Sequence, residues 1–404
     1  MLFRSWKLAQ NRFTQAVEEV RAGGARLLDL TLSNPTRAGL IYDERAILGA
    51  LASARALDYD PQAKGLVAAR EAVAGYYVAS NVSAGQIVLT TSTSEGYSFV
   101  FRLLCNAGDE LLVPKPSYPL FEFLADLQDV RLVPYPLIYD HGWQMDFPSL
   151  ERVVTERTRG VVVVHPNNPT GSYVSAGEME MLNSFCRERG LAVIADEVFL
   201  DYGLDGRGLP GLAKAARPGA PQIPVPQLSH VSFAGNCEVL TFTLSGLSKV
   251  VALPQMKVAW VVTSGPSLEV AAAMGRLEVI ADTYLSMNAP IQWAVPALLE
   301  QRKDIQRQLM ERVRKNLGEL DRQLAGQKAC ERLSVEGGWY AVLRVPVTRS
   351  DEELAIELVR EKAVVVHPGH FYDFPADGYL VLSLIMCEAE FGEGIGRVLG
   401  YLNS

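Results

Sequence analysis

Short apolar runs alternate with longer amphipathic stretches along most of the chain. The runs at residues 87–90, 110–113, 131–135 and 160–164 are each followed by a stretch with helical spacing of its apolar positions. A short apolar run bounded by turn signals is typical of a buried strand. Strands that alternate with helices favour a mainly parallel sheet with helices on both faces. The pattern therefore predicts an α/β fold whose main sheet lies between helices.

The two ends of the chain carry a second set of elements. An amphipathic helix over about residues 5–21 is followed by a short strand over 27–32, and a long helix over about 289–325 is interrupted near Pro296. The last part alternates strands and helices, at residues 337–343, 352–361, 364–366, 379–384 and 391–402. These elements predict a smaller α/β domain. Between the two sets, residues 205–236 are rich in Gly and Pro and predict a long irregular segment.

Composition narrows the class of protein. A chain of 404 residues, 49% of them hydrophobic, is long enough for two domains with large cores. The net charge of -8 and the lack of a basic run argue against nucleic acid as a partner. No apolar segment is long enough to span a bilayer, and the start lacks a signal core, so we expect a soluble, cytoplasmic protein with no membrane partner. The five scattered cysteines have no metal-ligand spacing, and we predict no metal site.

A candidate reactive amine, Lys249, follows an apolar strand predicted over residues 239–243. A lysine becomes nucleophilic when burial or a nearby cation lowers its pKa, and Lys257 lies eight residues further on. The alternative is an ordinary surface lysine in a loop. Other polar residues favour the reactive interpretation.

These other polar residues also follow predicted strands. A hydroxyl-rich turn after residues 87–90 opens a helix and can hold a phosphate, although Ser and Thr are also ordinary helix caps. The turn and the later strand-end residues are Ser92, Thr93, Ser94, Tyr118, Asn168 and Asp196. Each has a structural alternative, such as turn formation or packing. Since ligands collect at the carboxyl ends of parallel strands, we expect these side chains to meet at one edge of the sheet.

Taken together, these segments resemble the fold-type I pyridoxal-phosphate-dependent enzymes, specifically the class I/II aminotransferase family. The resemblance covers nearly the whole chain, and its motifs stand in the family's order. They are Tyr59-x-Pro-x-x-x-Gly65, Ser92-Thr93-Ser94-Glu95, Pro116-x-Tyr118, Asn167-Asn168-Pro169-Thr170-Gly171, Asp196-Glu197-Val198, and Ser248-Lys249 with Lys257.

The resemblance implies pyridoxal 5'-phosphate as cofactor and a role for each motif. Lys249 would form the imine with the cofactor and move the substrate proton, and Asp196 would keep the pyridine nitrogen protonated. Tyr118 would stack on the ring and Asn168 would donate to the ring oxygen. The phosphate would be held by Ser92, Thr93, Ser94, Ser248 and Lys257.

The resemblance also implies an assembly and a domain plan. Tyr59 would reach the phosphate of the neighbouring subunit, which implies a homodimer with shared active sites. We expect residues 1–45 to pack with the small domain, 46–290 to form the large cofactor-binding domain with a seven-stranded type of sheet, and 291–404 to form the small C-terminal domain.

Three positions depart from the family's pattern. Phe199 stands where the family usually has a tyrosine that donates to the ring oxygen, and Lys257 stands in place of an arginine. Val381, in Tyr379-Leu380-Val381-Leu382-Ser383, replaces the arginine that clamps the substrate carboxylate. Losing a bidentate charged pair costs roughly 2 kcal/mol or more of binding. Arg37 is a candidate replacement in substrate binding.

The resulting prediction is a pyridoxal-phosphate-dependent transaminase that transfers an amino group between an amino acid and a 2-oxo acid through a Lys249 imine. The alternative keeps the fold and cofactor but performs a lyase, decarboxylase or cyclase-like reaction, because Val381 removes the usual carboxylate anchor. His367 and His370 flank Pro368-Gly369 in a loop that the family places near substrate, and a structural role is expected for both.

Overall fold

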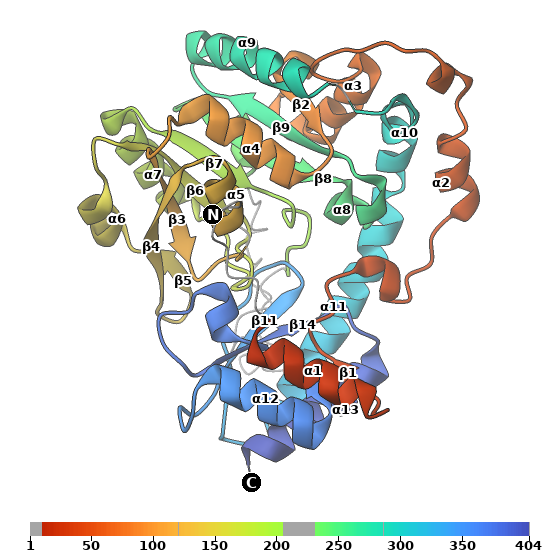
Figure 1. The fold of residues 1–404 in the computed structure, drawn as a ribbon, viewed down its shortest axis with the longest axis vertical. Helices are drawn as coiled ribbons and strands as arrows, with labels where there is room; N and C mark the ends of the chain where they lie inside the picture. Colours follow the sequence, from red (N-terminus) through yellow and green to blue (C-terminus); the bar gives the residue numbers. More distant parts are fainter. Residues whose placement is uncertain (1–9, 120, 205–230, 286, 404) are drawn as a thin grey trace, which may run out of the picture.

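The larger of two sheets carries most of the predicted strands. The computed structural model describes residues 10–119, 121–204, 231–285 and 287–403. In these ranges an eight-stranded sheet has the order β2-β9-β8-β7-β6-β3-β4-β5 (Figure 1). The strands are β2 (Ile87–Thr90), β3 (Glu110–Lys115), β4 (Arg131–Tyr139), β5 (Trp143–Met145), β6 (Thr158–Val164), β7 (Ala192–Asp196), β8 (Thr241–Gly246) and β9 (Ala259–Ser264).

Most strands of this sheet run in one direction. The neighbours β4, β3, β6, β7 and β8 are parallel, whereas β9 is antiparallel to both β8 and β2. Because β9 separates them, β2 and β8 point the same way, so the carboxyl end of β2 joins those of the parallel strands. The predicted α/β fold with a mainly parallel sheet is confirmed.

The sheet has one strand more than the predicted seven-stranded type. The additional edge strand β5 is antiparallel to β4, with Tyr139 opposite Trp143. A tight turn joins the two strands, in which the Asp140 amide donates to the Gly142 carbonyl. A three-residue edge strand is too short to give a periodic signal in the sequence.

Helices cover both faces of the large sheet. Alternate residues of β7 face opposite ways: Ile194 joins a core under α4 (Thr93–Leu104), α5 (Phe121–Leu127) and α9 (Ser267–Tyr284). Val193 and Ala195 join the core on the other face. The helices of that second face and of the adjoining β2 and β9 are α2 (Glu44–Ala50), α3 (Val67–Tyr76), α6 (Phe147–Val153), α7 (Ala176–Arg189) and α10 (Ala289–Glu300).

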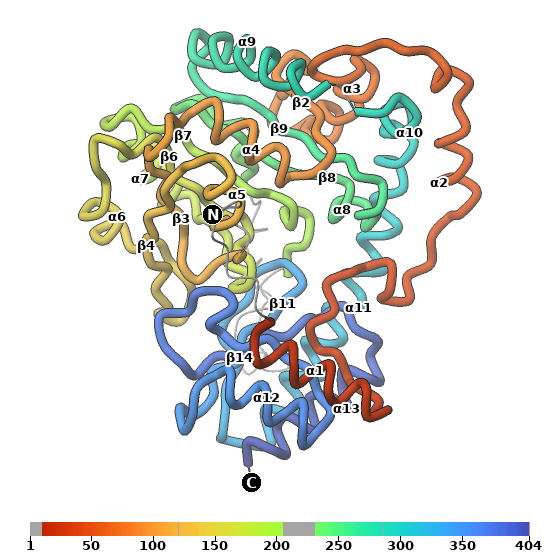
Figure 2. Tube along the Cα trace, viewed as in Figure 1, coloured from red at the N-terminus to blue at the C-terminus, as the bar shows by residue number. Residues whose placement is uncertain are grey.

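A smaller sheet forms from the C-terminal part of the chain. Its strand order is β10-β11-β14-β13, and a separate two-stranded sheet pairs β1 in parallel with β12. The elements are β1 (Leu28–Asp29), β10 (Glu331–Arg332), β11 (Tyr340–Arg344), β12 (Val364–Val365), β13 (His367–Pro368), β14 (Tyr379–Ser383), α1 (Arg12–Ala22), α11 (Arg302–Leu324), α12 (Asp351–Lys362) and α13 (Glu388–Leu402). Red and blue segments accordingly lie together in Figure 2.

The first helix begins later than the hydrophobic pattern predicts. The Asn11 side chain caps α1 by accepting from the Thr14 amide at 2.7 Å, so the helix starts at Arg12. The predicted residues 5–9 lie outside the described residues. So does most of the predicted irregular segment, at 205–230, although a short 3-10 turn spans Phe233–Gly235.

The predicted interruption at Pro296 is wrong. Pro296 lies inside α10, and the break falls at Gln301, between α10 and α11. The two helices serve different cores: Leu298 packs with residues of the large sheet, whereas Ile305 packs with the smaller one. The helix break therefore falls where the chain passes from one core to the other.

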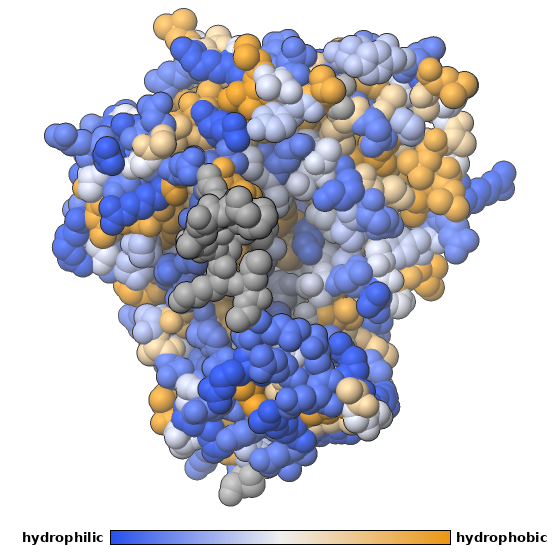
Figure 3. Space-filling model, in the orientation of Figure 1, coloured by the Kyte–Doolittle hydropathy of each residue, from blue (hydrophilic) through white to orange (hydrophobic). Residues whose placement is uncertain are grey.

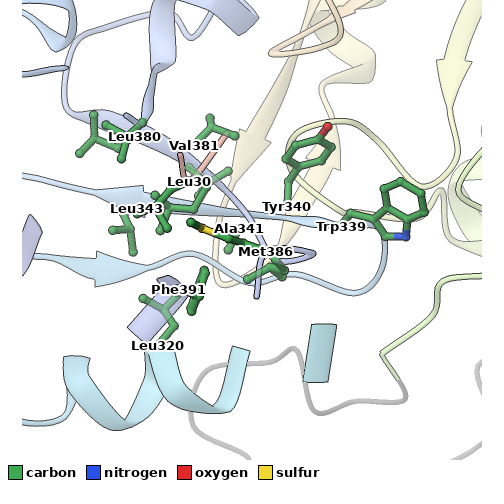
Figure 4. Close-up of a cluster of buried hydrophobic side chains, with 14 of the residues drawn as sticks. Leu30, Leu320, Trp339, Tyr340, Ala341, Leu343, Leu380, Val381, Met386 and Phe391 are labelled. Atoms are coloured by element: carbon green, nitrogen blue, oxygen red, sulfur yellow. The ribbon is translucent and has the colours of Figure 1, made fainter. Parts of the chain in front are cut away.

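The cores also group the ends of the chain. Phe13, Leu28 and Leu30 share one core with residues of α11 and α13. Figure 4 shows Leu30 in this cluster with Leu320 of α11 and Phe391 of α13. The division at residues 45/46 and 290/291 stays a prediction. No helix in the described ranges is both long enough and apolar enough to cross a membrane.

Gly246 ends β8 where the neighbouring strand approaches closely. A Cβ at Gly246 would lie 2.8 Å from the Val258 carbonyl oxygen and 2.9 Å from the Ala259 Cβ. Gly246→Ala is expected to lower the free energy of unfolding by about 1–3 kcal/mol, because the two strands must separate. Chemical denaturation measures the change.

Gly275→Ala is the matched control, since a Cβ at this position of α9 meets no atom within 4 Å. It should raise stability by up to about 1 kcal/mol through helix propensity. Equal stabilities for the two variants would contradict the steric explanation.

Candidate active site

A cavity of about 360 Å³ opens at the carboxyl edge of the large sheet, facing the smaller sheet. Its lining residues come from both sheets and from the loops that follow their strands. They are Ser33, Thr93, Tyr118, Pro119, Val164, Asn168, Asp196, Val198, Phe199, Ser248, Lys249, Tyr340, His367 and Tyr372. The structure thus brings together Thr93, Tyr118, Asn168, Asp196, Ser248 and Lys249 of the predicted site.

Lys249 lies in the short helix α8 (Leu247–Val250), directly after β8. The Leu247 amide donates to the carbonyl of Val258, which directly precedes β9, and the Tyr202 hydroxyl donates to the Lys249 carbonyl at 2.6 Å. Lys249 Nζ lies 5.2 Å from the ring centroid of Phe199 and 4.6 Å from that of Trp339. Burial lowers the pKa of Lys249 to about 8, although the Asp196 charge acts in the opposite direction.

Asp196 is the buried carboxylate of the cavity. One carboxylate oxygen accepts from the Val198 amide at 3.1 Å, and the other accepts from the Tyr97 hydroxyl at 2.9 Å. Burial raises the pKa of Asp196 to about 6, against the effect of these two hydrogen bonds and of Lys249. The site therefore keeps a carboxylate in a place where its charge is poorly solvated.

Asn168 and Thr93 offer further polar groups. The buried Asn168 Oδ1 has no hydrogen-bond partner in the described part of the chain. Rotating the amide exchanges its donor and acceptor, so Asn168 can present either to a ligand. Thr93 stands in the first turn of α4, where free amides and the helix dipole favour an anion.

Five predicted site residues do not line the cavity. The Ser92 side chain caps α4 by accepting from the Glu95 amide at 3.2 Å, and Ser94 follows in the first turn of that helix. Lys257 is exposed and adopts a left-handed backbone conformation with φ 53°. Tyr59 and Arg37 are also exposed. Their assignment to the site stays a prediction.

The smaller sheet supplies another wall of the cavity, where the resemblance placed the loop of His367 near substrate but did not predict Tyr340. Tyr340 lies on β11, and His367 lies on β13. His367 Nδ1 is 3.0 Å from the Tyr372 hydroxyl, and burial lowers the pKa of the imidazole. His370, by contrast, is exposed. His367 thus makes the structural contact expected of it and also lines the cavity.

Tyr97 is a second residue that the sequence reasoning missed. It lies four residues after Thr93 on α4, so both side chains face the same side of the helix. That spacing from the hydroxyl-rich turn is a signal that could have found it. Tyr340 and Ser33 give no such local signal, because their position depends on how the two sheets are packed together.

Comparison with known proteins decides the family. The sequence model of the family described as aminotransferase class I and II matches residues 43–386. The chain belongs to this family. The expected resemblance is confirmed.

Relatives of this aminotransferase span most of its length. It is 25% identical over 375 residues to the glutamate-pyruvate aminotransferase AlaA of Haemophilus influenzae, covering 89% of this chain and 87% of the relative. It is 26% identical over 407 residues to an alanine aminotransferase of Mycobacterium bovis, covering 96% and 89%. An alanine aminotransferase from Pyrococcus furiosus shares the fold with a TM-score of 0.85 at 20% identity, covering 97% and 96%.

The protein is accordingly a pyridoxal-phosphate-dependent aminotransferase, which transfers an amino group between an amino acid and a 2-oxo acid. The alternative of a lyase, decarboxylase or cyclase-like enzyme finds no support in these comparisons. The cavity fits the cofactor. It combines an amine of lowered pKa, a buried carboxylate, an unpaired buried amide oxygen and a helix N-terminus.

Asp196→Asn is expected to stabilise the cofactor-free aminotransferase by up to about 3 kcal/mol near pH 7.5. The pKa of Asp196 rises from 3.8 to about 6 on folding, so this carboxyl costs stability as the pH rises through that interval. Below about pH 3 it is protonated in both states and the difference vanishes. An asparagine can keep both hydrogen bonds, since the Tyr97 hydroxyl can also accept.

Denaturant unfolding of both proteins across this pH range measures the effect. Asp282→Asn, at an exposed position of α9, serves as the control and should change stability by less than about 0.5 kcal/mol. A stability difference between wild type and Asp196→Asn that does not vary with pH would contradict the prediction.

Proposed function

We propose that amino transfer takes place at Lys249, which binds the cofactor covalently and then carries the substrate proton. The observation that supports this assignment is the burial of its ammonium group. Burial lowers the pKa of Lys249 to about 8, even though the charge of Asp196 raises it. A general base works best when its pKa lies near the working pH. The bound cofactor supplies an electron sink for the substrate α-carbon.

Asp196 holds the protonated ring nitrogen, and Tyr97 positions Asp196. The Tyr97 hydroxyl and the Val198 amide fix both carboxylate oxygens, so the carboxylate cannot rotate freely. A cation placed against Asp196 restores the solvation that burial removes, because opposite charges attract strongly in a poorly solvated site. The raised pKa of Asp196 supports this role, since a further cationic partner would favour its charged form.

The phosphate binds at the N-terminus of α4, where Thr93 and Ser248 contact it, and Lys257 supplies the positive charge. Asn168 binds the ring oxygen and Tyr118 stacks on the ring. Ser92 acts through its helix cap, which orders the first turn of α4. Lys257 reaches the phosphate only if its exposed side chain folds towards the cavity, and its left-handed backbone places it at the turn before β9.

Phe199 changes the surroundings of the amine. Its ring packs edge-on against Trp339 at 5.2 Å, and both rings lie near Lys249 Nζ. A phenylalanine offers no hydroxyl to the ring oxygen, so that hydrogen bond rests on Asn168. The two rings attract the ammonium form of Lys249 and exclude water from it.

We also propose that alanine or glutamate is the amino donor, from the names of the relatives that this chain resembles over most of its length. The protein acts as a homodimer, and its placement in the cytoplasm stays a prediction. Exposed apolar side chains support a covered surface near Tyr59: Ile41, Leu48, Leu57 and Tyr59 itself are 78%, 62%, 90% and 82% exposed. Figure 3 shows apolar residues gathered over α2 on this side. Such a patch is typical of a subunit interface.

Lys249→Ala should abolish the visible absorbance of the covalently bound cofactor and reduce turnover of alanine by at least about a thousandfold, because both attachment and proton transfer are lost. Lys257→Ala is the matched control. It should keep the absorbance while cofactor affinity falls by about tenfold or more, as expected for one charged hydrogen bond. Unchanged absorbance in Lys249→Ala would refute the assignment.

The shared site predicts complementation between two variants. Lys249→Ala and Tyr59→Ala are co-expressed with different tags, and the hybrid dimer is purified. If Tyr59 serves the neighbouring subunit, the hybrid has one site with both residues intact and recovers activity well above either parent. Activity equal to the mean of the parents, or a monomer in size-exclusion chromatography, would rule out the shared site.

A further inference from the structure

Within the part of the chain that the structure describes, the smaller sheet contributes no cation to the lining of the cavity. Among the residues that line it in the described ranges, Lys249 is the single lysine and there is no arginine. Val381 is buried with 1% of its surface exposed, and it cannot bind a carboxylate. An amino acid substrate nevertheless brings a carboxylate into this site, so another group must replace the missing charge.

The strand register identifies which side chains surround Val381. On β14, Val381 pairs with Val342 of β11 on one side and with His367 of β13 on the other. Residues directly opposite in antiparallel strands point to the same face, and so do alternate residues of one strand. Val381, His367, Val342 and Tyr340 therefore share one face. Figure 4 shows Tyr340 and Val381 on one side of the sheet and Ala341 and Leu343 on the other.

His367 and Tyr340 are the polar members of this face that line the cavity. Neighbouring strands lie about 4.8 Å apart, so the His367 side chain starts one strand spacing from the position of the missing arginine. No hydrogen bond of His367 Nε2 or of the Tyr340 hydroxyl is found within the described residues, whereas His367 Nδ1 is bonded to the Tyr372 hydroxyl. When this phenol donates to Nδ1, the hydrogen of the neutral imidazole resides on Nε2.

We propose that His367 Nε2 and the Tyr340 hydroxyl hold the substrate carboxylate, as neutral hydrogen-bond donors on the sheet face that Val381 shares. The proposal rests on the function assigned to Lys249 above. Burial keeps His367 neutral by lowering its pKa, and the nearby Asp29 acts in the opposite direction. Tyr372 fixes the orientation of the ring.

Neutral donors have a consequence for specificity. An arginine binds a carboxylate through two charge-assisted bonds, and an amide at the same place loses this pairing. Hydrogen bonds from a phenol and a neutral imidazole discriminate much less between a carboxylate and an amide, because an amide oxygen also accepts. This aminotransferase should therefore tolerate amides of its amino donors far better than an arginine-containing site would.

Calorimetric titration of the holoenzyme with propionate and with propionamide tests the proposal, since neither probe carries an amino or oxo group. Wild type should bind the two with dissociation constants within about tenfold. His367→Ala and Tyr340→Phe should each weaken propionate by about tenfold, the loss of one hydrogen bond to a charged group. His367→Gln can keep a donor in the place of Nε2 and should stay within about threefold of wild type.

His370→Ala is the control, because His370 lies in the same loop but is exposed. It should change neither affinity. The absorbance of the bound cofactor should be retained in all these variants, which separates a failure here from a failure of the Lys249 assignment.

Three results would overturn the proposal. They are unchanged affinities in both His367→Ala and Tyr340→Phe, the failure of both probes to bind wild type, and binding of propionate more than about a hundredfold tighter than propionamide. In the last case Arg37→Ala should abolish the preference, which would assign the carboxylate to Arg37.

Discussion

The burial of Lys249 beside Asp196 is the interaction on which the rest of the site depends. Each group is desolvated, and each charge partly compensates the burial of the other. The pKa values of the two groups move towards each other, to about 6 and about 8, from 3.8 and 10.5. Each shift corresponds to about 3 kcal/mol of unfavourable burial. The large cores of the two sheets must offset this cost.

The same burial explains the surroundings of the pair. Asp196 accepts hydrogen bonds from the Tyr97 hydroxyl and the Val198 amide. The Lys249 carbonyl accepts one from the Tyr202 hydroxyl. These groups keep a reactive amine and a carboxylate at fixed positions, which a solvated surface pair could not achieve. The burial that lowers the stability of the protein also gives the site two groups whose protonation changes near neutral pH.

The half of the site on the large sheet could be predicted from sequence, because it follows from one topological rule. Thr93, Asn168, Asp196 and Lys249 each follow an apolar strand, and strands that point the same way bring their ends to one edge. The opposite wall could not be predicted in this way. Tyr340 and His367 line the cavity only because of the way the two sheets pack against each other. The register that places His367 opposite Val381 depends on pairing between two strands, and the sequence does not identify these strands as partners. A proline inside a helical pattern likewise predicts a break at Pro296, although the helix ends at Glu300, where the chain passes between cores.

Because β1 pairs with β12, these two strands are adjacent in the fold although they are synthesised far apart in time. Leu28 and Asp29 pair with Val364 and Val365, so a segment synthesised before the large sheet can pair only with a segment synthesised after it. Contacts so distant in sequence form slowly, and an apolar strand without its partner is prone to aggregation. The large sheet can collapse before its wall is complete, because its strands lie between Ile87 and Ser264. During synthesis, then, the edge of the sheet that carries Lys249 can form before the wall of the cavity that carries His367.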